Sequence, residues 1–332
     1  MTMLVTGASG FVAAALVEEA ARRGERVVAV DRAAPPPELQ AAWTALPGQV
    51  RFAAADVRDR AALAELLRQH AVETLVHGAA VTSGPQREAA APAEVLEINV
   101  VGTARVLEAA HAAGVGRVVH LSSASAYGAA AFAGDALDEV ETACQPESLY
   151  SISKFAGERT VRRLADLWGL DVRVARLTAV FGRWERDTGV RDTLSPQFQA
   201  TALALRGGEA VLARPGLRDW IYVRDVADAV LALRDAAAVP PVVNVGPGRE
   251  WSLACWCGLL AERYPRFRWR LAELGEPATV DLHGDRDRRP LAVERLGSVG
   301  YRSGWTLQRS FADYVAWVEA HSGLVMRPPS AG

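Results

Sequence analysis

Short apolar runs alternate with amphipathic stretches along the first half of the chain. The runs predict strands over 3–5, 27–30, 50–54, 74–77, 118–121 and 172–177. The stretches between them carry apolar residues at helical spacing and predict helices over 11–23, 61–70, 93–113 and 149–167. Strands that alternate with helices form a parallel sheet covered on both faces, so the pattern predicts a doubly wound α/β fold.

The pattern changes near Thr178, beyond which short strands are mixed with helices. We expect helices over 195–206, 225–235, 252–263 and 307–319. Ligands of a doubly wound sheet bind at the carboxyl ends of its strands. We therefore predict one domain over 1–177 and a smaller mixed α/β lobe over 178–332 that mainly binds substrate, some of whose segments return to the first sheet.

The first predicted strand ends in a glycine-rich turn, and a helix follows it directly at Phe11 and Val12. Gly7 permits a tight turn, and Gly10 lets the backbone approach a pyrophosphate, whose charge then meets the N-terminus of the helix. Asp31 closes the second strand, at the place where a carboxylate accepts hydrogen bonds from an adenosine ribose. This order is typical of dinucleotide binding in a Rossmann-type domain. The alternative is a helix-capping turn in another α/β protein.

The residues after the second strand bear on the choice between NAD and NADP. The Asp31 carboxylate repels the 2′-phosphate of NADP and so favours NAD. Arg32, directly after it, is the kind of residue that accommodates that phosphate. We expect NAD as the cofactor, with NADP as the alternative.

Lys154 is the only lysine of the chain, since all other members of its 37 Lys and Arg residues are arginine. It follows Tyr150 by four positions, so both side chains lie on one face of a predicted helix. A nearby ammonium stabilises phenolate and lowers the pKa of a tyrosine, which can then accept a proton from an alcohol. The alternative is an ordinary helix with a solvated lysine, because this spacing often arises by chance.

Composition gives no indication of a macromolecular or membrane partner. The 332 residues are 50% hydrophobic and 23% charged, enough for one large domain or two smaller ones, and the net charge is -2. Cys144, Cys255 and Cys257 suggest no disulfide framework, and no further ligands complete a metal site around the last two. We expect no metal, no nucleic acid, no membrane span, no signal peptide and a cytoplasmic location.

These motifs, taken in order, resemble the extended short-chain dehydrogenases/reductases, also called the NAD-dependent epimerase/dehydratase family. The resemblance covers most of the chain. The matching segments are T-G-x-x-G-x-x-A at 6–13, D-V at 56–57, H-G-A-A at 77–80, N-V-V-G-T at 99–103, S-S-A-S-A-Y-G at 122–128, Y-x-x-x-K at 150–154, R-D-W-I-Y-V-R-D-V-A at 218–227 and N-V-G at 244–246.

The resemblance implies roles for individual residues. Tyr150 is the acid/base, Ser123 hydrogen-bonds the reacting oxygen, and Lys154 lowers the pKa of the tyrosine and contacts the nicotinamide ribose. Ser125 is a rival hydroxyl, and Asn99 equally fits a buried helix asparagine. The cofactor-binding residues are then Gly7, Gly10, Phe11, Val12, Asp31, Arg32, Asp56, Val57, Ala79, Ala80, Asn99, Tyr150 and Lys154.

Departures from the family pattern narrow the set of reactions that the resemblance implies. Family dehydratases need an acid pair next to the catalytic hydroxyl, and this chain has Ala124 and Ser125 there. The neutral run favours epimerisation or dehydrogenation. Nucleotide-sugar members usually carry an asparagine where this chain has Ala179 and a proline where it has Arg183, which weakens that substrate class without excluding it.

A charged loop at 183–192 begins the expected substrate lobe, and loops at strand ends often carry function. Its arginines form either a fork for a carboxylate or diphosphate or ion pairs within a solvated loop. Arg218 is favoured because it matches an anion-binding position of the family. The predicted substrate contacts are Ser123, Ser125, Arg183, Arg191 and Arg218, with Arg186, Arg288 and Arg289 as further candidates.

The predicted protein is an NAD-dependent enzyme that oxidises a secondary alcohol of a sugar-derived substrate, with a sugar or nucleotide-sugar epimerase preferred. The main alternative is a net dehydrogenase of a free sugar, sugar acid or small hydroxy acid, and a remote one is a non-catalytic dinucleotide sensor. Family members often pair through the helices that correspond to 93–113 and 149–167, so a homodimer is expected.

Overall fold

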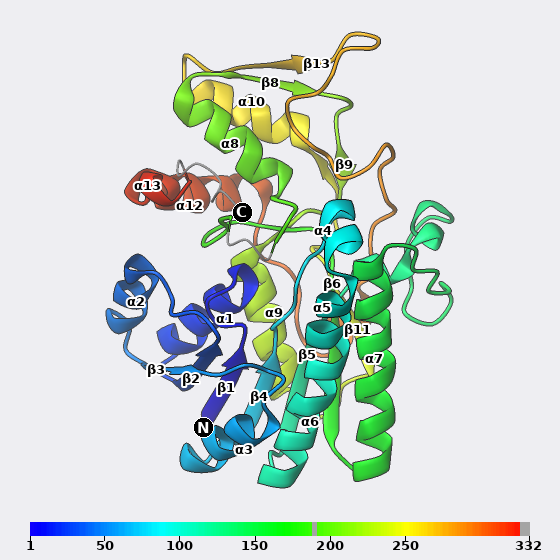
Figure 1. Ribbon diagram of the computed structural model, residues 1–332. Coiled ribbons are helices and arrows are strands. Elements are labelled where there is room, and N and C mark those ends of the chain that lie inside the picture. Colours follow the sequence, from blue (N-terminus) through cyan, green and yellow to red (C-terminus); the bar gives the residue numbers. More distant parts are fainter. Residues whose placement is uncertain (188–190, 326–332) are drawn as a thin grey trace.

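A seven-stranded parallel sheet lies at the centre of the computed structural model, which describes residues 1–187 and 191–325 (Figure 1). The strand order is β11-β6-β5-β4-β1-β2-β3. From β1 the chain adds β2 and β3 on one side, then crosses back and adds β4, β5, β6 and β11 on the other side, as in a doubly wound sheet. The predicted α/β fold is confirmed. The strands are β1 (Thr2–Thr6), β2 (Arg26–Asp31), β3 (Gln49–Ala54), β4 (Thr74–His77), β5 (Arg117–Ser123), β6 (Asp171–Leu177) and β11 (Val242–Val245).

Helices cover both faces of this sheet because successive strand residues point to opposite sides. In β1, Met3 and Val5 belong to the core formed with α1 (Phe11–Arg22) and α9 (Val223–Asp235). Leu4, between them, belongs to the core on the other face. That face is covered by α3 (Arg60–Gln69), α6 (Gly102–Ala113) and α7 (Leu149–Trp168).

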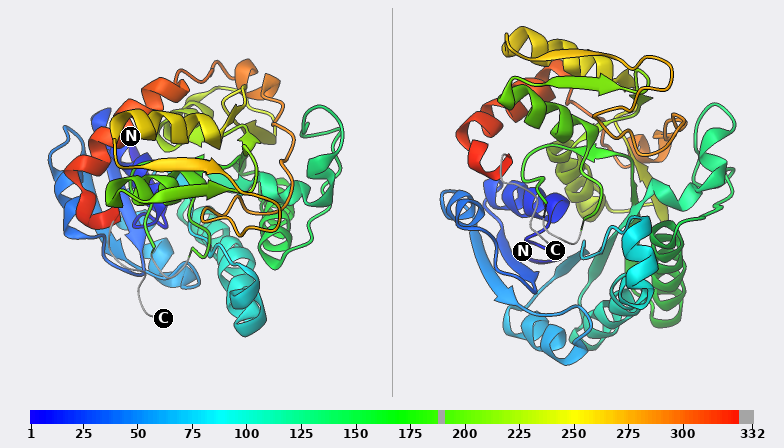
Figure 2. Two further views of the ribbon diagram at one scale, coloured as in Figure 1. Left: turned by 90° about the horizontal axis from the view of Figure 1, so that it is seen from above. Right: turned by 45° about the horizontal axis from the view of Figure 1, so that its top comes forward.

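The second half of the chain forms a lobe beyond the carboxyl ends of the strands (Figures 1 and 2). Three two-stranded sheets pair β7 (Val180–Phe181) with β10 (Ile221–Tyr222), β8 (Glu209–Leu212) with β13 (Arg268–Leu271), and β9 (Leu217–Arg218) with β12 (Trp251–Ser252). The lobe's helices are α8 (Pro196–Arg206), α10 (Leu253–Arg263), α12 (Leu307–Ala320) and α13 (Ser322–Val325), and α11 (Glu294–Ser298) packs against β11. Fully buried Trp256 packs against Phe181, Phe311 and Tyr314, which gives the lobe its own aromatic core.

The two halves of the chain are interleaved. The strand β11 pairs in parallel with β6, and α9 packs against α1, although both elements follow residue 178. The sheet therefore includes a strand from the second half, and the lobe consists of the segments around it.

The predicted helix over 93–113 is interrupted in the structure. It consists of α5 (Pro92–Leu96), a π-helical turn at Glu97–Val101, and α6. The short helices α2 (Pro37–Thr44) and α4 (Pro85–Ala90) are among those that were not predicted. Both begin with proline at the first helical position, where the missing N–H costs nothing and the fixed φ suits the helix.

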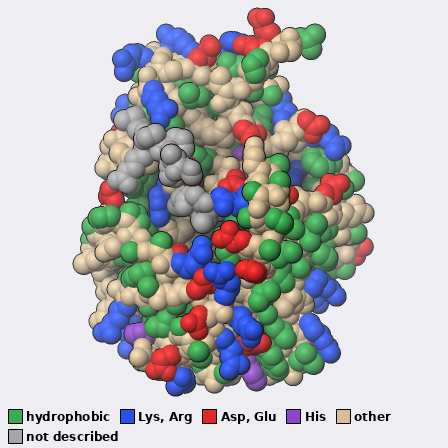
Figure 3. Space-filling model, viewed as in Figure 1, with side chains coloured by type: hydrophobic (Ala, Val, Ile, Leu, Met, Phe, Trp, Pro, Cys, Tyr) green, Lys and Arg blue, Asp and Glu red, His purple; other side chains and the backbone are tan. Residues whose placement is uncertain are grey.

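Basic and acidic side chains are interspersed on the face of the molecule seen in Figure 3. Within 1–187 and 191–325, no helix combines the length and the apolar character that crossing a membrane requires. The same residues contain no group of three or more His, Cys, Asp or Glu side chains that could hold a metal ion.

Candidate active site

A cavity of about 420 Å³ lies between the carboxyl ends of the strands and the second lobe. The sheet side contributes segments that follow β1, β2, β3, β4, β5 and β6, and the lobe side contributes Arg186, Arg191, Arg218, His283 and Arg288. Parallel strands bring residues that are distant in sequence to one edge, which explains why motifs spread over 7–180 meet here.

The glycine turn lies at one end of the cavity. Gly7 has a φ of +73°, and a Cβ there would lie 2.7 Å from the Cα of Ala79, so only glycine fits. Helix α1 begins after Gly10 without a side-chain cap and without an acidic residue in its first turn. Its first N–H groups, together with the positive end of the helix dipole, can therefore bind an anion.

Two carboxylates line the same end, at the tips of β2 and β3. Asp31 Oδ2 accepts a hydrogen bond of 3.0 Å from the backbone N–H of Ser9, which fixes the carboxylate beside the turn. Asp56 accepts from the Arg58 guanidinium at 2.7 Å, and that bond holds the pKa of Asp56 below its usual value. Arg32 also lines the cavity, with its Nη1 4.0 Å from Asp56 Oδ2.

Asn99 does not line the cavity, so the geometry supports the alternative of a buried helix asparagine rather than the predicted cofactor contact. Its side chain is buried and fully engaged with protein groups. Oδ1 accepts from Val81 N at 2.8 Å, and Nδ2 donates to Val81 O and to Ser153 Oγ, both at 2.9 Å. The π-helical turn directs the amide toward the segment after β4. There the amide holds this part of the cavity wall from the side that faces away from the cavity.

Ser123, Tyr150 and Lys154 meet at the opposite end of the cavity. Ser123 ends β5, and its hydroxyl interacts with the Tyr150 phenol and accepts from Ser125 N at 3.1 Å. Ser125 Oγ is buried and has no hydrogen-bond partner within the described chain. Ser125 thus offers a hydroxyl that a ligand in the cavity can use.

Lys154, which the sequence predicts to lower the pKa of Tyr150, is held by a backbone carbonyl. Lys154 Nζ donates to the backbone carbonyl of Leu121 at 2.6 Å, and burial lowers the pKa of Lys154 to about 8. The pKa of Tyr150 is raised by burial, against which hydrogen bonds from Ser123 and Thr82 and the charge of Arg191 act. Sequence spacing placed the lysine on the right face, but desolvation of the phenol outweighs these favourable contacts.

Glu158 holds residues that lie next to the catalytic group of Ser123, Tyr150 and Lys154. It was not identified from the sequence. It lies one turn beyond Lys154 on α7 and forms two hydrogen bonds with the buried Arg176, of 2.8 and 2.7 Å. Glu158 Oε1 also accepts from Ser122 at 2.6 Å, next to Ser123. The signal was present, because positions 150, 154 and 158 share one helix face.

The lobe end of the cavity is basic. Neither Arg218 nor Arg288 forms a hydrogen bond or ion pair with a carboxylate of the described residues, although both line the cavity. Burial and the neighbouring charge of Arg288 lower the pKa of Arg218 to about 10. Arg191 also lines the cavity, but its Nη2 lies 3.0 Å from Glu185 Oε1. The charge of Asp219 acts on both arginines, but without a contacting carboxylate the two guanidiniums are suited to an anionic group.

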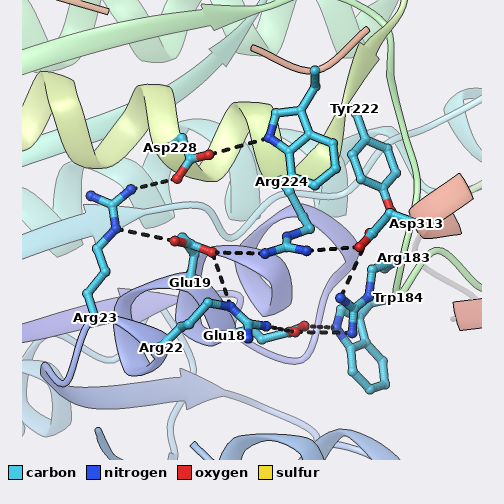
Figure 4. Close-up of polar contacts among 11 residues, drawn as sticks. Glu18, Glu19, Arg22, Arg23, Arg183, Trp184, Tyr222, Arg224, Asp228 and Asp313 are labelled. Atoms are coloured by element: carbon cyan, nitrogen blue, oxygen red, sulfur yellow. Dashed lines mark hydrogen bonds and ion pairs between the residues drawn. The ribbon is translucent and has the colours of Figure 1, made fainter. Parts of the chain in front are cut away.

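Arg183 does not line the cavity, and its contacts give no support to the predicted substrate contact. Its Nη2 lies 3.1 Å from Glu18 Oε1 on α1, and its Nη1 lies 3.9 Å from Asp313 on α12 (Figure 4). Glu18 also accepts a hydrogen bond of 2.6 Å from Trp184 Nε1. The loop turns here with Trp184 at a φ of +68°, which directs Arg183 into the contact between α1 and the lobe.

Arg186, the next arginine of the loop, reaches the cofactor end. Its Nη2 donates to the backbone carbonyl of Ser9 in the glycine turn at 2.6 Å. Residues 188–190 of the predicted charged loop lie outside the described residues.

Comparison with known proteins agrees with this geometry. The family model described as "NAD dependent epimerase/dehydratase family" matches residues 3–246. The chain belongs to this family. A UDP-glucose 4-epimerase of Mycolicibacterium smegmatis is 32% identical over 255 residues, covering 76% of this chain and 79% of that protein.

Two dehydratases show the same family similarity over longer alignments. A dTDP-glucose 4,6-dehydratase of Xanthomonas campestris is 27% identical over 332 residues, covering 95% of this chain and 92% of that protein. The structure of a Streptomyces venezuelae dTDP-glucose 4,6-dehydratase with NAD bound has a TM-score of 0.77 at 27% identity, covering 97% of this chain and 98% of the other. This chain is therefore an NAD-dependent enzyme of the family.

The residues present fit that cofactor. The glycine turn and the uncapped start of α1 suit its diphosphate, and Asp31 and Asp56 lie where an adenosine would extend. The carboxylate of Asp31 favours a ribose hydroxyl over a 2′-phosphate, in agreement with NAD.

Proposed function

We propose that the protein is an NAD-dependent epimerase that acts on a secondary alcohol of a nucleotide-linked sugar. One observation carries the proposal: a single cavity has Ser123, Tyr150 and Lys154 at one end and, at the lobe side, Arg218 and Arg288, which no carboxylate of the described residues contacts. The alcohol reacts at the first end, and the anionic linkage binds at the second.

Tyr150 is assigned the proton transfer. Its phenol interacts with Ser123, so a substrate hydroxyl placed between them can pass its proton to the phenolate form of Tyr150, which becomes the phenol, while Ser123 hydrogen-bonds the same oxygen. Lys154 is held beside them by Leu121, with its ammonium available to the nicotinamide ribose. Bound NAD supplies the hydride acceptor and, after the change of configuration, the hydride donor.

Arg218 and Arg288 are assigned the diphosphate of the substrate. Guanidinium groups bind phosphate oxygens with paired hydrogen bonds, and burial strengthens the interaction because water competes less. The relatives act on dTDP- and UDP-linked sugars according to their names, which supports this substrate class for the present chain.

Epimerisation is favoured over dehydration by the charges around Tyr150. Asp31 and Asp56 are the only carboxylates among the described residues that line the cavity, and both lie at the adenosine end. Elimination of water from a sugar needs an acid and a base in addition to the tyrosine. Ser123 and Ser125 supply hydroxyl groups instead, which suit orientation of a sugar.

A second candidate is a net dehydrogenase of a sugar acid or hydroxy acid. Ala179 lines the cavity and offers no side-chain hydrogen bond where nucleotide-sugar members usually carry an asparagine. The same two arginines then bind a carboxylate.

We also propose that the protein is a homodimer. Leu96, Val101 and Ile152 are 38%, 48% and 41% exposed, and they lie on the adjoining segments α5, the π-helical turn and α7. A second copy would remove this apolar surface from water. Light scattering should give twice the chain mass, and a monomeric mass would contradict the proposal.

The three free cysteines support a reducing, cytoplasmic setting.

Substitution of Tyr150 by phenylalanine tests the assigned chemistry. Tyr150→Phe removes the proton acceptor and is expected to lower kcat by at least about 100-fold. Bound NAD, measured by absorbance and mass spectrometry, should be retained. Turnover near the wild-type rate would refute the assignment of Tyr150.

A further inference from the structure

The short helix α4 lies beside the catalytic end of the cavity, and its adjacent residues Arg87 and Glu88 contact two different segments. Neither residue belongs to a motif that identified the family. Together they connect the segment after β4, the segment before α8 and the beginning of α7, where Tyr150 lies.

Glu88 binds the backbone of the catalytic tyrosine. Its Oε1 accepts from Tyr150 N at 3.0 Å and from Ser83 Oγ at 3.2 Å. Tyr150 is the second residue of α7, so this N–H has no acceptor within the helix. A carboxylate at this position is also favoured by the positive end of the helix dipole. Glu88 therefore fixes the point from which the Tyr150 side chain extends.

Arg87 binds Asp192 from the opposite side. Its Nη2 lies 2.7 Å from Asp192 Oδ1, and its Nε lies 2.9 Å from Oδ2. Asp192 also accepts from Gly84 N at 2.9 Å and donates its own N–H to Thr82 O at 3.1 Å. The Arg87 and Asp192 side chains are only 26% and 22% exposed, so this bidentate pair is screened less than a surface pair.

These contacts place two groups around the Tyr150 phenol. Arg191 forms a parallel backbone bridge with Thr82, and its guanidinium packs over the Phe11 ring at 4.9 Å while lining the cavity. Burial raises the pKa of Tyr150, and the charge of Arg191 and a hydrogen bond with the Thr82 side chain oppose that rise. The Arg191 guanidinium itself is held by Glu185 Oε1 at 3.0 Å and by Thr193 O at 2.8 Å. Because Asp192 follows Arg191 directly, the bond to Arg87 fixes the backbone from which that side chain extends.

We propose that Arg87 and Glu88 are positioning residues for the reaction. Glu88 holds the backbone of Tyr150, and Arg87 acts through Asp192 to hold Arg191 and Thr82 beside the phenol. This inference rests on the proposed role of Tyr150. It assigns to Arg191 an action on the tyrosine in addition to contact with substrate.

Glu88 is tested by two substitutions. Glu88→Ala removes the acceptor, and kcat is expected to fall roughly tenfold because a small displacement of a catalytic group reduces the rate strongly. KM and bound NAD should change little. Glu88→Gln keeps an oxygen acceptor and should recover most of the rate. Equal, large losses in both variants, or wild-type kcat in Glu88→Ala, would overturn the role of Glu88.

Arg87 is tested together with its partner. Arg87→Ala and Asp192→Asn should each lower kcat several-fold, and the double variant should be no slower than the slower single one, because both remove the same contact. The acid limb of the kcat profile should move to higher pH, since a displaced Arg191 no longer favours phenolate. Additive losses, or an unchanged pH profile, would overturn the role of Arg87. Arg87→Gln replaces Arg87→Ala if the latter fails to fold.

A matched control separates these effects from loss of any ion pair. Arg263 and Glu319 join α10 to α12 at 2.7 Å, away from the cavity residues. Arg263→Ala should leave kcat and its pH profile unchanged. If Tyr150→Phe is inactive while the Arg87 and Glu88 variants match wild type, this inference fails and the proposed function stands. If Tyr150→Phe is active, the proposed function fails.

Discussion

Two groups of arginines in this protein, one buried and one half-buried, differ in the carboxylates that contact them. Under the sheet, Arg176 is paired with Glu158, and Arg234 Nη2 lies 2.8 Å from Glu25 Oε1. At the lobe side of the cavity, Arg218 and Arg288 have no carboxylate partner among the described residues. Burying a charge without a partner costs free energy, so the second group indicates a site that an anionic ligand completes.

A buried arginine whose guanidinium is satisfied by protein groups can also stabilise the end of a helix. Arg173, also largely buried, donates to the carbonyl oxygens of Leu233 and Ala236 at the end of α9. Those carbonyls have no partner within the helix, so the guanidinium satisfies them. The comparison teaches that burial of an arginine alone does not mark a ligand site, whereas a cavity-lining arginine that no carboxylate contacts indicates one.

The largest expected effect is on stability, at the paired group. Glu158→Ala leaves Arg176 buried and uncompensated and should lower the free energy of unfolding by about 3–5 kcal/mol. Urea unfolding followed by fluorescence measures it. Arg68→Ala, which breaks the exposed pair with Glu65, should change stability by less than about 1 kcal/mol. A similar small effect of Glu158→Ala would remove the distinction between the groups.

The next effect is on binding, at the unpaired group. Arg218→Ala should raise KM for a nucleotide sugar by roughly 10- to 100-fold, because a charge-assisted contact with phosphate is lost. Its free energy of unfolding should stay near the wild-type value or rise, since a desolvated cation is removed. Steady-state kinetics and urea unfolding measure both quantities. Strong destabilisation with unchanged KM would assign Arg218 to the structural group.

A further effect, confined to acidic pH, concerns a buried pair of histidines that belongs to neither group of arginines. Burial lowers the pKa of His77 to about 3 and that of His120 well below its usual value, so both are neutral in the folded protein. The unfolded chain binds these protons below about pH 6.5, so stability falls as pH decreases from there toward 3, by about 1.4 kcal/mol per pH unit and histidine.

Substitution of His120 measures this contribution. Both ring nitrogens of His120 lack hydrogen-bond partners within the described part of the chain. His120→Phe should therefore reduce the slope of unfolding free energy between about pH 6 and pH 4 by close to one proton. An unchanged slope in His120→Phe would show that it is not buried and neutral.

Much of the cofactor end could be predicted from the sequence because local chemistry determines it. Gly7 is needed where the backbone passes Ala79 at close range, and Asp31 ends a strand at a fixed distance from that turn. The alternation of strands and helices follows from which faces are buried. These features depend on residues close in sequence or on the period of the pattern.

The substrate end could be predicted only in part, because it depends on contacts between distant segments. Arg183 and Arg191 both lie in the charged loop, and the sequence does not distinguish their roles. In the structure, Arg183 binds Glu18 on α1, whereas Arg191 lines the cavity. The raised pKa of Tyr150 results from burial by several elements, which its spacing from Lys154 does not reveal. Asn99 is directed away from the cavity by a π-helical turn that apolar periodicity does not distinguish from α-helix.

The identity of any nucleotide that the purified protein retains tests the central claim most directly. An epimerase keeps its cofactor through oxidation and reduction, so denatured protein should release close to one NAD per chain, with no NADP, as measured by mass spectrometry. Protein that releases no nucleotide, and that accumulates NADH with sugar acids or hydroxy acids, would contradict epimerisation and indicate a dehydrogenase with an exchangeable cofactor.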